Sequence, residues 1–501
     1  MSYDLGRSAV ISPGGASSGT ADGLVAEPPG RERLVSAAIR VAGSALDALI
    51  VLYAVGLMLI AVRGGVDLGF VRFHRAAKPV LMLIGLVPVR LALGGPSWLG
   101  YLCRQSAARL KVEWAQMCGR VPAAVADSAF AIATVSAASL SATFFANLVL
   151  APASARAFSL PFANEKFVEI FAAWDSGWYW DIATHGYYFR PDAQSSIAYF
   201  PLYPMLMRAA AAPFGGGDAA TWIAGIVVSF AAFAAALVAV HRLTERIFED
   251  REIARRAVLY IAVFPWSLFM TRVYTESVFL LTTVLAVSHA WESRWSRAGL
   301  WGALATLTRP NGILIGVPLL LLAARGRPGL RTLATRLLVL APIPAALVGY
   351  SAYVYWLTGD PLGWMSAQAQ WGYSLGHPPW QQLLRVVTSL MDAGIYRYFF
   401  TSDIAPVELL HAVTALIFLA LTPAVFRRLG AAMGTYTLMN LLLPLSSNTL
   451  EGLGRYTSVL FPVFMLAAGW KSARGHEAIL IFALIFQTLA AWLFITWQPI
   501  Y

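Results

Sequence analysis

Long apolar segments without any charged residue constrain this chain more than any other feature of its sequence. Several of them approach the ~20 residues that an α-helix needs to cross a lipid bilayer; examples are residues 221–240, 337–357 and 478–497. Their apolar residues are continuous and do not alternate with polar ones, which favours helices over a β-barrel. Only 13% of the 501 residues are charged, against about 25% in soluble globular proteins. The sequence therefore predicts an all-α integral membrane protein.

The predicted organisation has three parts. Residues 1–30 are rich in Gly, Ser, Ala and Pro and are expected to form a disordered cytoplasmic tail, without a cleaved signal peptide. Residues 31–123 form an N-terminal membrane segment to which no role is assigned. Residues 124–501 form the main polytopic domain, and the chain has roughly 11–13 transmembrane helices in all. Two long loops, 151–218 and 358–406, are dense in aromatic residues and are expected to carry amphipathic helices on the membrane surface.

The positions of Lys and Arg orient the chain in the membrane. The net charge of +11 comes from basic residues beside apolar spans, as the positive-inside rule describes, so it gives no reason to expect a nucleic-acid partner. Basic residues before the first span and in the loops 103–120 and 242–256 place these segments in the cytoplasm. Loop 151–218 has no basic excess and is predicted to lie outside. Basic residues within 63–78 conflict with this scheme unless one of the first two spans is only interfacial.

Loop 151–218 contains the most distinctive segment of the chain, residues 174–187 with the sequence WDSGWYWDIATHGY. If residues 174–185 are helical, Asp175 shares a face with Trp178 and Tyr179. Asp181 then points elsewhere, so the two aspartates do not share a proton. A carboxylate among aromatic rings is a candidate general base, because a low dielectric raises its pKa. A belt of interfacial aromatic residues is the alternative, but a belt does not call for the carboxylate.

Two further segments supply candidate binding residues. Tyr203 lies in YFPLYP, where two prolines predict an extended turn; the segment is either a rigid connector or part of a sugar site. Glu276 lies in the short polar link RVYTES between two spans on the predicted outer side. An ion pair with Arg272 at i, i+4 is the structural alternative for Glu276.

Two arginines at the ends of apolar segments are candidate phosphate ligands, since a planar guanidinium fits a phosphate. Arg309 precedes Pro310 and has basic segments on both sides, which predicts two short helices that enter and return with Arg309 at the bend. A single span with a proline kink is the alternative. Arg455 opens a span from the outer side, where it either binds substrate or anchors the helix at the interface. Asp47 and His411, each alone in a span, are assigned no chemistry.

The sequence predicts no bound cofactor and no metal site. Cys103 and Cys118 are the only cysteines and lie in a loop predicted to be cytoplasmic, so neither a disulfide nor a cysteine metal site is expected. A Walker loop, a dinucleotide fingerprint and an HExxH motif are absent from the sequence. An activated substrate is therefore expected to come through the membrane and not from a soluble nucleotide.

Taken in order, these motifs resemble the phosphatidylinositol-glycan class V type mannosyltransferases of the GT-C glycosyltransferase superfamily. The matching segments are WDSGWY at Trp174 followed by IATHGY, FPLYP at Phe200, YTES at Tyr274, LTRPNG at Leu307, GDP at Gly359, AQWG near Gln370 and GRY at Gly454. Each motif alone is short, but their order and spacing make the resemblance specific over about residues 125–470. The resemblance implies a GT-C-like transmembrane glycosyltransferase domain for residues 124–501.

The resemblance also implies an inverting, metal-independent transferase whose donor is a polyprenyl-phosphate sugar, with mannose as the expected sugar. The active site would face away from the cytoplasm, in loop 151–218. By analogy, Asp175 would be the general base that removes the proton of the acceptor hydroxyl, with Asp181 as the alternative base. Substrate binding is expected from Trp174, Trp178, Tyr179, Tyr203, Glu276, Arg309 and Arg455. Either arginine could stabilise the charge of the leaving phosphate.

Other functions stay open at this stage. A transporter or flippase of lipids or glycans would have internal symmetry between its halves and charges near mid-bilayer, and neither is evident. A non-catalytic membrane scaffold is a third hypothesis. The acceptor of a transferase could be a lipid, a glycan or a protein. The chain is expected in the plasma membrane of a bacterium, or in the endoplasmic reticulum membrane of a eukaryote, with its active site on the extracytoplasmic side.

Overall fold

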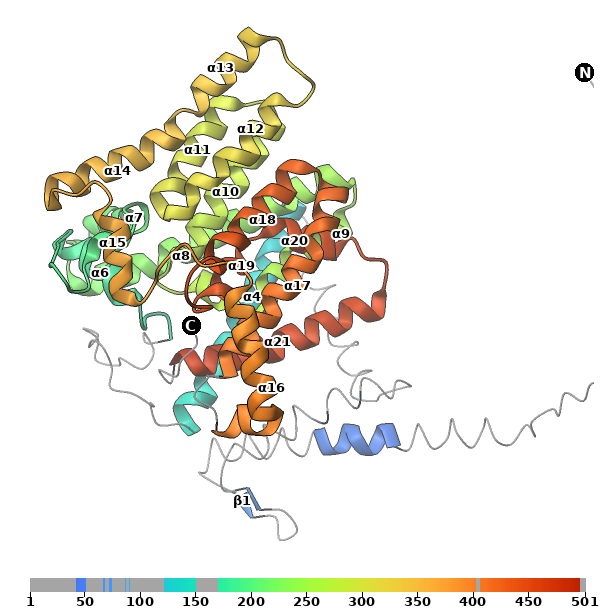
Figure 1. Ribbon diagram of the computed structural model, residues 1–501. Helices are drawn as coiled ribbons and strands as arrows, with labels where there is room; N and C mark the ends of the chain where they lie inside the picture. Colours follow the sequence, from blue (N-terminus) through green and yellow to red (C-terminus); the bar gives the residue numbers. More distant parts are fainter. Residues whose placement is uncertain are drawn as a thin grey trace, which may run out of the picture.

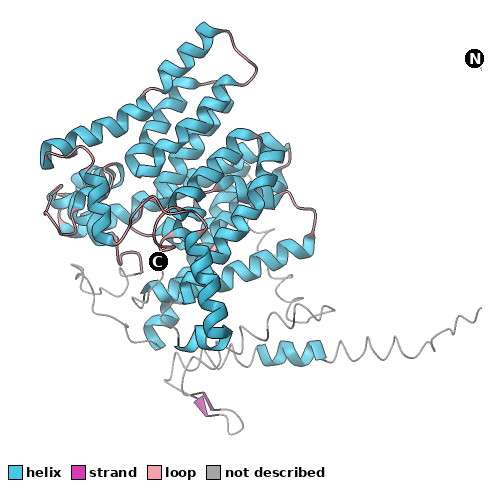
Figure 2. Ribbon diagram, viewed as in Figure 1, coloured by secondary structure: helices cyan, strands magenta, loops and turns pink. Residues whose placement is uncertain are grey.

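Helices make up nearly all of the regular structure of the chain (Figure 2). The computed structural model describes residues 42–50, 66–67, 72–73, 86, 90, 121–149, 170–401 and 406–495. Within these residues, β1 (Val66–Asp67) and β2 (Arg72–Phe73) form one short antiparallel pair. The predicted all-α fold is therefore confirmed. The predicted tail 1–30, most of the segment 31–123 and both cysteines lie outside the described residues.

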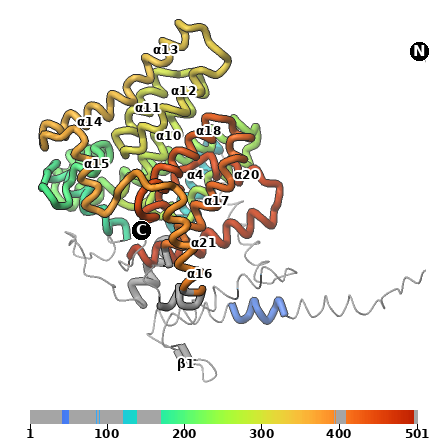
Figure 3. Tube along the Cα trace, viewed as in Figure 1, coloured from blue at the N-terminus to red at the C-terminus, as the bar shows by residue number. Residues whose placement is uncertain are grey.

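The main domain is a bundle joined by shorter helices in its loops and bends (Figures 1 and 3). The bundle helices are α4 (Ala123–Val149), α8 (Asp218–Phe248), α9 (Arg251–Val263), α10 (Glu276–Trp291), α11 (Trp295–Thr308), α12 (Gly316–Ala324), α13 (Leu330–Leu340), α14 (Pro342–Thr358), α16 (Gln381–Thr401), α17 (Pro406–Leu429), α18 (Ala431–Leu445), α20 (Phe461–Ala468) and α21 (Ala473–Ile495). The connecting helices are α6 (Ser176–His185), α7 (Leu202–Ala211), α15 (Gly363–Gln368) and α19 (Leu453–Ser458). The 3₁₀ turns are η1 (Ser196–Ala198), η2 (Ala212–Phe214), η3 (Pro265–Thr271), η4 (Pro310–Ile315) and η5 (Ala369–Trp371).

Several of these helices are long and apolar enough to cross a membrane. Four qualify among the described residues: Asp218–Phe248, Leu330–Thr358, Glu408–Leu429 and Ala473–Ile495. α9 and η3 qualify only as a pair, which is bent by 84°. Shorter apolar helices are Ala123–Ala137, Glu276–Trp291, Pro310–Ala324 and Ala431–Leu445. The multi-pass character is confirmed, while the count of roughly 11–13 crossings stays a prediction.

One large apolar core joins α8, α9, α10, α18 and α20. Its buried side chains include Phe233, Val258 and Phe279. Helices in a bilayer gain little from hydrophobic burial and depend on close packing, for which small residues are suited. α8 supplies such residues, and Ala232 and Ala236, one turn apart, are both buried.

The bend at Pro265 positions the polar link that follows it. Proline has no N–H to continue the hydrogen-bond ladder of α9, so that helix ends and η3 leaves at 84°. The chain then runs through the link until α10 begins at Glu276. The N–H of Val273 donates to the carbonyl of Phe171 at 2.9 Å. The polar link therefore lies directly beside the segment that leads into Asp175.

The chain reverses direction at Arg309, as the hairpin prediction required. A Cβ atom on Gly312 would lie 2.1 Å from the carbonyl oxygen of Ala305, whereas seven residues of continuous helix would separate these positions by roughly 10 Å. The start of α11 at Trp295 and the end of α12 at Leu322 also line the same pocket. A single kinked span is therefore excluded, and glycine is required where η4 folds back onto α11.

Candidate active site

Asp175 lies on a strained turn at the start of α6. The residue before it, Trp174, has a positive φ of 58°, which is unfavourable for a side chain of this size. The turn is tied to the polar link before α10: the N–H of Asp175 donates to the Tyr274 hydroxyl at 3.2 Å, and that hydroxyl donates to the carbonyl of Ala173 at 3.1 Å. Tyr274 therefore fixes the backbone that carries the carboxylate.

Arg455 connects Asp175 to Glu276. Its Nη1 atom lies 2.8 Å from Asp175 Oδ2, and its Nε atom donates to Glu276 Oε1 at 2.7 Å. The guanidinium lies over the rings of Tyr274 and Phe269, at 4.6 and 5.0 Å from their centroids. Two carboxylates and two aromatic faces thus hold this arginine in a single orientation.

Glu276 is shared by a second arginine. It is the first residue of α10, its side chain is fully buried, and Arg309 Nη2 also donates to its Oε1 atom. Arg309 Nε donates to Thr275 Oγ1 at 2.7 Å. We call Asp175, Glu276, Arg309 and Arg455 the charged cluster. Its two carboxylates and two guanidiniums balance in charge, which reduces the penalty of burying it.

Two atoms of the charged cluster keep unused hydrogen-bonding capacity. Among the described residues, Glu276 Oε2 and Arg309 Nη1 are buried and have no hydrogen-bond partner. Buried polar atoms without a partner are uncommon, because each costs about 1–3 kcal/mol of desolvation. The cluster can therefore accept one hydrogen bond and donate another to a bound molecule.

Aromatic side chains form one wall of the site. The Tyr199 hydroxyl donates to Asp175 Oδ1 at 3.3 Å, and Trp178 stacks on Tyr199 with a centroid distance of 5.7 Å. Trp371, from η5 in the second long loop, meets both rings edge-on at 5.2 and 5.6 Å. The two aromatic loops predicted on the outer side thus meet beside Asp175.

Asp181 and Tyr203 lie away from the charged cluster. Asp181 is on another face of α6, where its Oδ1 atom lies 2.9 Å from Nδ1 of His185. Tyr203 is fully buried and packs edge-on against Tyr179. Its hydroxyl bonds to Ser229 Oγ at 2.8 Å and to a backbone carbonyl of α8. Tyr203 thus supports Tyr179 from behind. The extended turn predicted over YFPLYP is wrong from Leu202 onward, because Pro201 and Pro204 lie at the start of the helix α7, where proline is tolerated.

The ion pair between Arg272 and Glu276, the structural alternative for Glu276, does not form; Glu276 pairs with Arg309 and Arg455. The backbone is extended at Arg272 (φ −98°, ψ 170°), so the i, i+4 spacing is not helical there. Arg272 is fully buried between the rings of Phe171 and Phe494, with its Cζ atom 5.4 and 5.5 Å from their centroids. Its Nη1 atom bonds to Thr271, while Nε and Nη2 have no hydrogen-bond partner among the described residues.

Glu451 is a second acidic residue near Asp175 that sequence reasoning missed. It lies in the loop between α18 and α19, at the edge of the site. Partial burial raises the pKa of the Glu451 carboxyl, and the nearby negative charge of Asp175 raises it further. The positive charge of Arg455 opposes this shift. The sequence held one sign that Glu451 belongs to the site: it lies four residues before Arg455, in LEGLGRY.

The loop that carries Glu451 is held by the second aromatic loop. Leu375 forms an isolated β-bridge with Ser447, and the N–H of Asn448 donates to the carbonyl of Ser374 at 3.1 Å. Tyr373 lies near Glu451. Burial raises the pKa of the Tyr373 hydroxyl, and the negative charge of Glu451 raises it further.

In the described part of the chain, no three His, Cys, Asp or Glu side chains meet in a way that could hold a metal ion.

Comparison with known proteins confirms the resemblance that the motifs predicted. Residues 133–322 match the family described as "Mannosyltransferase (PIG-V)". The chain is 26% identical over 162 residues to GPI mannosyltransferase 2 of Yarrowia lipolytica, covering 32% of this chain and 43% of the relative. It is 31% identical over 144 residues to GPI mannosyltransferase 2 of Schizosaccharomyces pombe, covering 28% and 29%. The chain thus spans less than half the length of these relatives.

Among solved structures, the chain is similar to the archaeal oligosaccharyltransferase AglB from Archaeoglobus fulgidus. The similarity has a TM-score of 0.39 and 13% identity, and it covers 74% of this chain and 56% of that one. The matched family segment contains three residues of the charged cluster, Asp175, Glu276 and Arg309; Arg455 lies beyond its end.

Proposed function

We propose that the chain is an inverting glycosyltransferase that moves mannose from a polyprenyl-phosphate donor to an acceptor hydroxyl on the extracytoplasmic face of the membrane. The observation that carries this proposal is the position of Asp175. It is a partly exposed carboxylate on a rigid turn, inside a segment that matches a mannosyltransferase family. The names of the relatives make a GPI-type glycolipid the first acceptor to test.

Asp175 has the position that a general base needs. Arg455 holds its Oδ2 atom, so Oδ1 faces the hydroxyl of Tyr199 at a long 3.3 Å. An acceptor hydroxyl that displaces this weak contact would give its proton to Oδ1. The acceptor oxygen then bonds to the anomeric carbon as the bond from that carbon to the phosphate oxygen breaks on the opposite face. The configuration inverts, and the lipid phosphate leaves with the electron pair.

Arg309 is the better candidate of the two arginines for the phosphate. Arg455 already uses Nη1 and Nε on carboxylates. Arg309 keeps Nη1 without a partner among the described residues, and a charge-assisted hydrogen bond from it would stabilise the leaving phosphate. Trp178, with Trp371 beside it, offers an aromatic surface for the sugar. We assign Tyr203 a supporting role and regard Asp181 as the weaker candidate base.

The test compares Asp175→Asn with Asp181→Asn in purified full-length protein. Transfer from a radiolabelled polyprenyl-phosphate mannose to a glycolipid acceptor should fall by about 10²–10⁴-fold in Asp175→Asn, the usual contribution of general-base catalysis. Asp181→Asn should keep most of the activity and the melting temperature of the wild type. Asp175→Asn should still fold but melt lower, because it leaves the charged cluster with one carboxylate for two guanidiniums. Transfer by Asp175→Asn at the wild-type rate would refute the assignment. Donor movement across vesicles without any transfer would favour the flippase alternative.

A further inference from the structure

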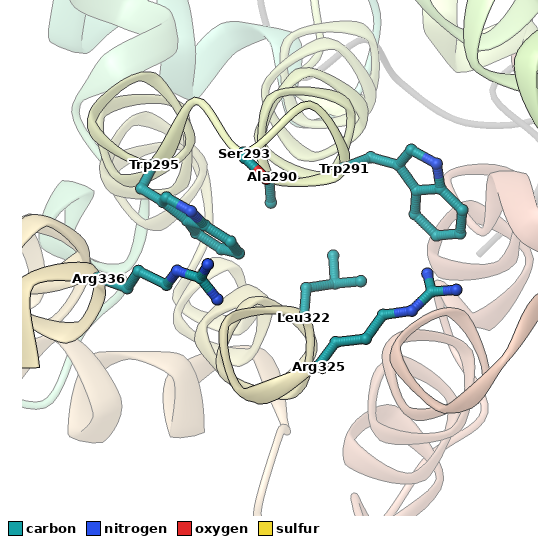
Figure 4. A pocket seen from close by; sticks show the side chains of 7 residues that line it. All are labelled: Ala290, Trp291, Ser293, Trp295, Leu322, Arg325 and Arg336. Atoms are coloured by element: carbon teal, nitrogen blue, oxygen red, sulfur yellow. The ribbon is translucent and has the colours of Figure 1, made fainter. Parts of the chain in front are cut away.

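A basic pocket lies at the opposite end of α10 from the charged cluster (Figure 4). Glu276 begins α10, whereas Trp291 ends it and lines the pocket. Sixteen residues of helix separate the two sites by about 24 Å. The pocket has a volume of about 140 Å³ and also contains Trp295, Leu322, Arg325 and Arg336. It is therefore a separate site, on the other side of the bundle.

Each arginine of this pocket lies over a tryptophan. Arg325 Cζ is 5.2 Å from the ring centroid of Trp291, and Arg336 Cζ is 5.0 Å from that of Trp295. Figure 4 shows the two pairs on either side of the cavity, with Leu322 between them. Aromatic faces attract guanidinium groups and restrict their orientation. The two side chains are thus held at the pocket and do not extend freely into water, as interfacial anchors would.

The pocket carries two positive charges and no acidic residue. Within the described residues, neither Arg325 nor Arg336 forms an ion pair; Arg336 Nη1 donates only to the carbonyl of Ala323, at 2.6 Å. Glu292 lies nearby in sequence but is paired with Arg246 and Arg294. The remaining guanidinium donors suit the oxygens of a phosphate group, which accept paired hydrogen bonds from arginine.

The surface beside the pocket suits acyl chains. α13 follows directly and exposes Leu330 and Leu338 at 86% and 73%, and α12 exposes Leu321 at 40%. The stretch Leu330–Thr358 is apolar enough to cross the membrane, yet only 22% of its apolar 18-residue window is buried within the protein. A phosphate held at the pocket would therefore have a lipid-facing apolar surface immediately beside it.

We propose that this pocket binds the phosphodiester headgroup of an anionic glycerophospholipid in the leaflet opposite the charged cluster. Arg325 and Arg336 contact the phosphate oxygens, and the acyl chains lie along the exposed leucines of α13. The inference is independent of the transferase proposal, because no residue of the charged cluster takes part in it.

Binding of phosphatidylglycerol to full-length protein in detergent, followed by native mass spectrometry, tests this inference. The Arg325→Gln/Arg336→Gln variant should bind at least ten-fold more weakly than wild type. Arg327→Gln/Arg331→Gln is the matched control, since it removes two arginines from the same segment that do not line the pocket; it should bind as wild type does. Equal weakening in both variants would mean general surface attraction and would overturn the pocket assignment.

Two further ligands separate the possible sources of the phosphate. Diacylglycerol, which lacks the phosphate, should bind weakly to all variants. Inorganic phosphate should not raise the melting temperature of the wild type at concentrations where phosphatidylglycerol does. Equal protection by inorganic phosphate would show a soluble-anion site and overturn the lipid assignment. If the double variant does not fold, Arg325→Gln alone replaces it, because no hydrogen bond of the fold depends on that side chain within the described residues.

Discussion

Replacing Glu276 with glutamine tests whether the charged cluster stabilises the fold as a unit. Glu276 is fully buried, and its Oε1 atom accepts hydrogen bonds from Arg309 and Arg455. Glutamine keeps the shape and removes the charge. Both guanidiniums are nearly buried; Arg455 would keep the carboxylate of Asp175, whereas Arg309 would lose the carboxylate that it contacts.

The expected loss follows from these contacts. A hydrogen bond to a charged group contributes about 1 kcal/mol more than a neutral one, so the two bonds together lose roughly 2 kcal/mol. The uncompensated buried cation adds to this, and removal of one partner from a buried ion pair typically costs about 3–5 kcal/mol. We therefore expect Glu276→Gln to lower the free energy of unfolding by about 3–5 kcal/mol.

The measurement is denaturant unfolding in mixed micelles, with two comparison variants. Glu245→Gln is the control, because this glutamate of α8 is 45% exposed and lies 3.7 Å from His241; it should change the free energy by less than about 0.5 kcal/mol. Glu276→Gln/Arg309→Met restores the charge balance and should recover a large part of the loss. A loss for Glu276→Gln no greater than that of the control, or no recovery in the double variant, would refute the reasoning.

Three other substitutions give further tests. Arg272→Met should leave the melting temperature unchanged or raise it, because this buried guanidinium has two nitrogens without partners among the described residues; a clear drop would contradict this. Because the folded-state pKa of Glu451 is raised, its neutral form stabilises the fold at acid pH and that stability is lost as pH rises. Glu451→Gln should therefore melt higher than wild type near neutral pH but equally at about pH 4, with a smaller difference when Asp175→Asn is also present. Gly312→Ala should abolish transfer by displacing η4, whereas Gly349→Ala, where nothing lies within 4 Å, should be silent.

Local patterns predicted the parts of the site that depend on neighbouring residues. The separation of Asp175 from Asp181 assumed a helix over 174–185, and α6 is observed at Ser176–His185. Pro310 and the basic flanks predicted the reversal at Arg309, which the contact between Gly312 and Ala305 confirms. Both outcomes follow from forces that act within one or two turns of the chain.

The pairing within the charged cluster could not be predicted in the same way. The nearest cation to Glu276 in sequence is Arg272, but its partners are 33 and 179 residues away. These contacts depend on how α10, η4 and α19 pack together, and no local pattern specifies that arrangement. Glu451 escaped prediction for the same reason, because its proximity to Asp175 arises from the position of the loop before α19.

The exposed fractions of the four side chains in the charged cluster indicate different roles for them. The Asp175 side chain is 26% exposed, whereas those of Arg455, Arg309 and Glu276 are 12%, 10% and 0% exposed. Asp175 is therefore the most accessible member of the charged cluster to a molecule arriving from solvent or from the membrane surface. Arg455 touches both carboxylates and is a positioning residue, since it fixes the direction of Asp175 and keeps Glu276 neutralised. Because burial of four charges is tolerable only while they balance, the carboxylate that we propose as the general base is held in place by groups far from it in sequence.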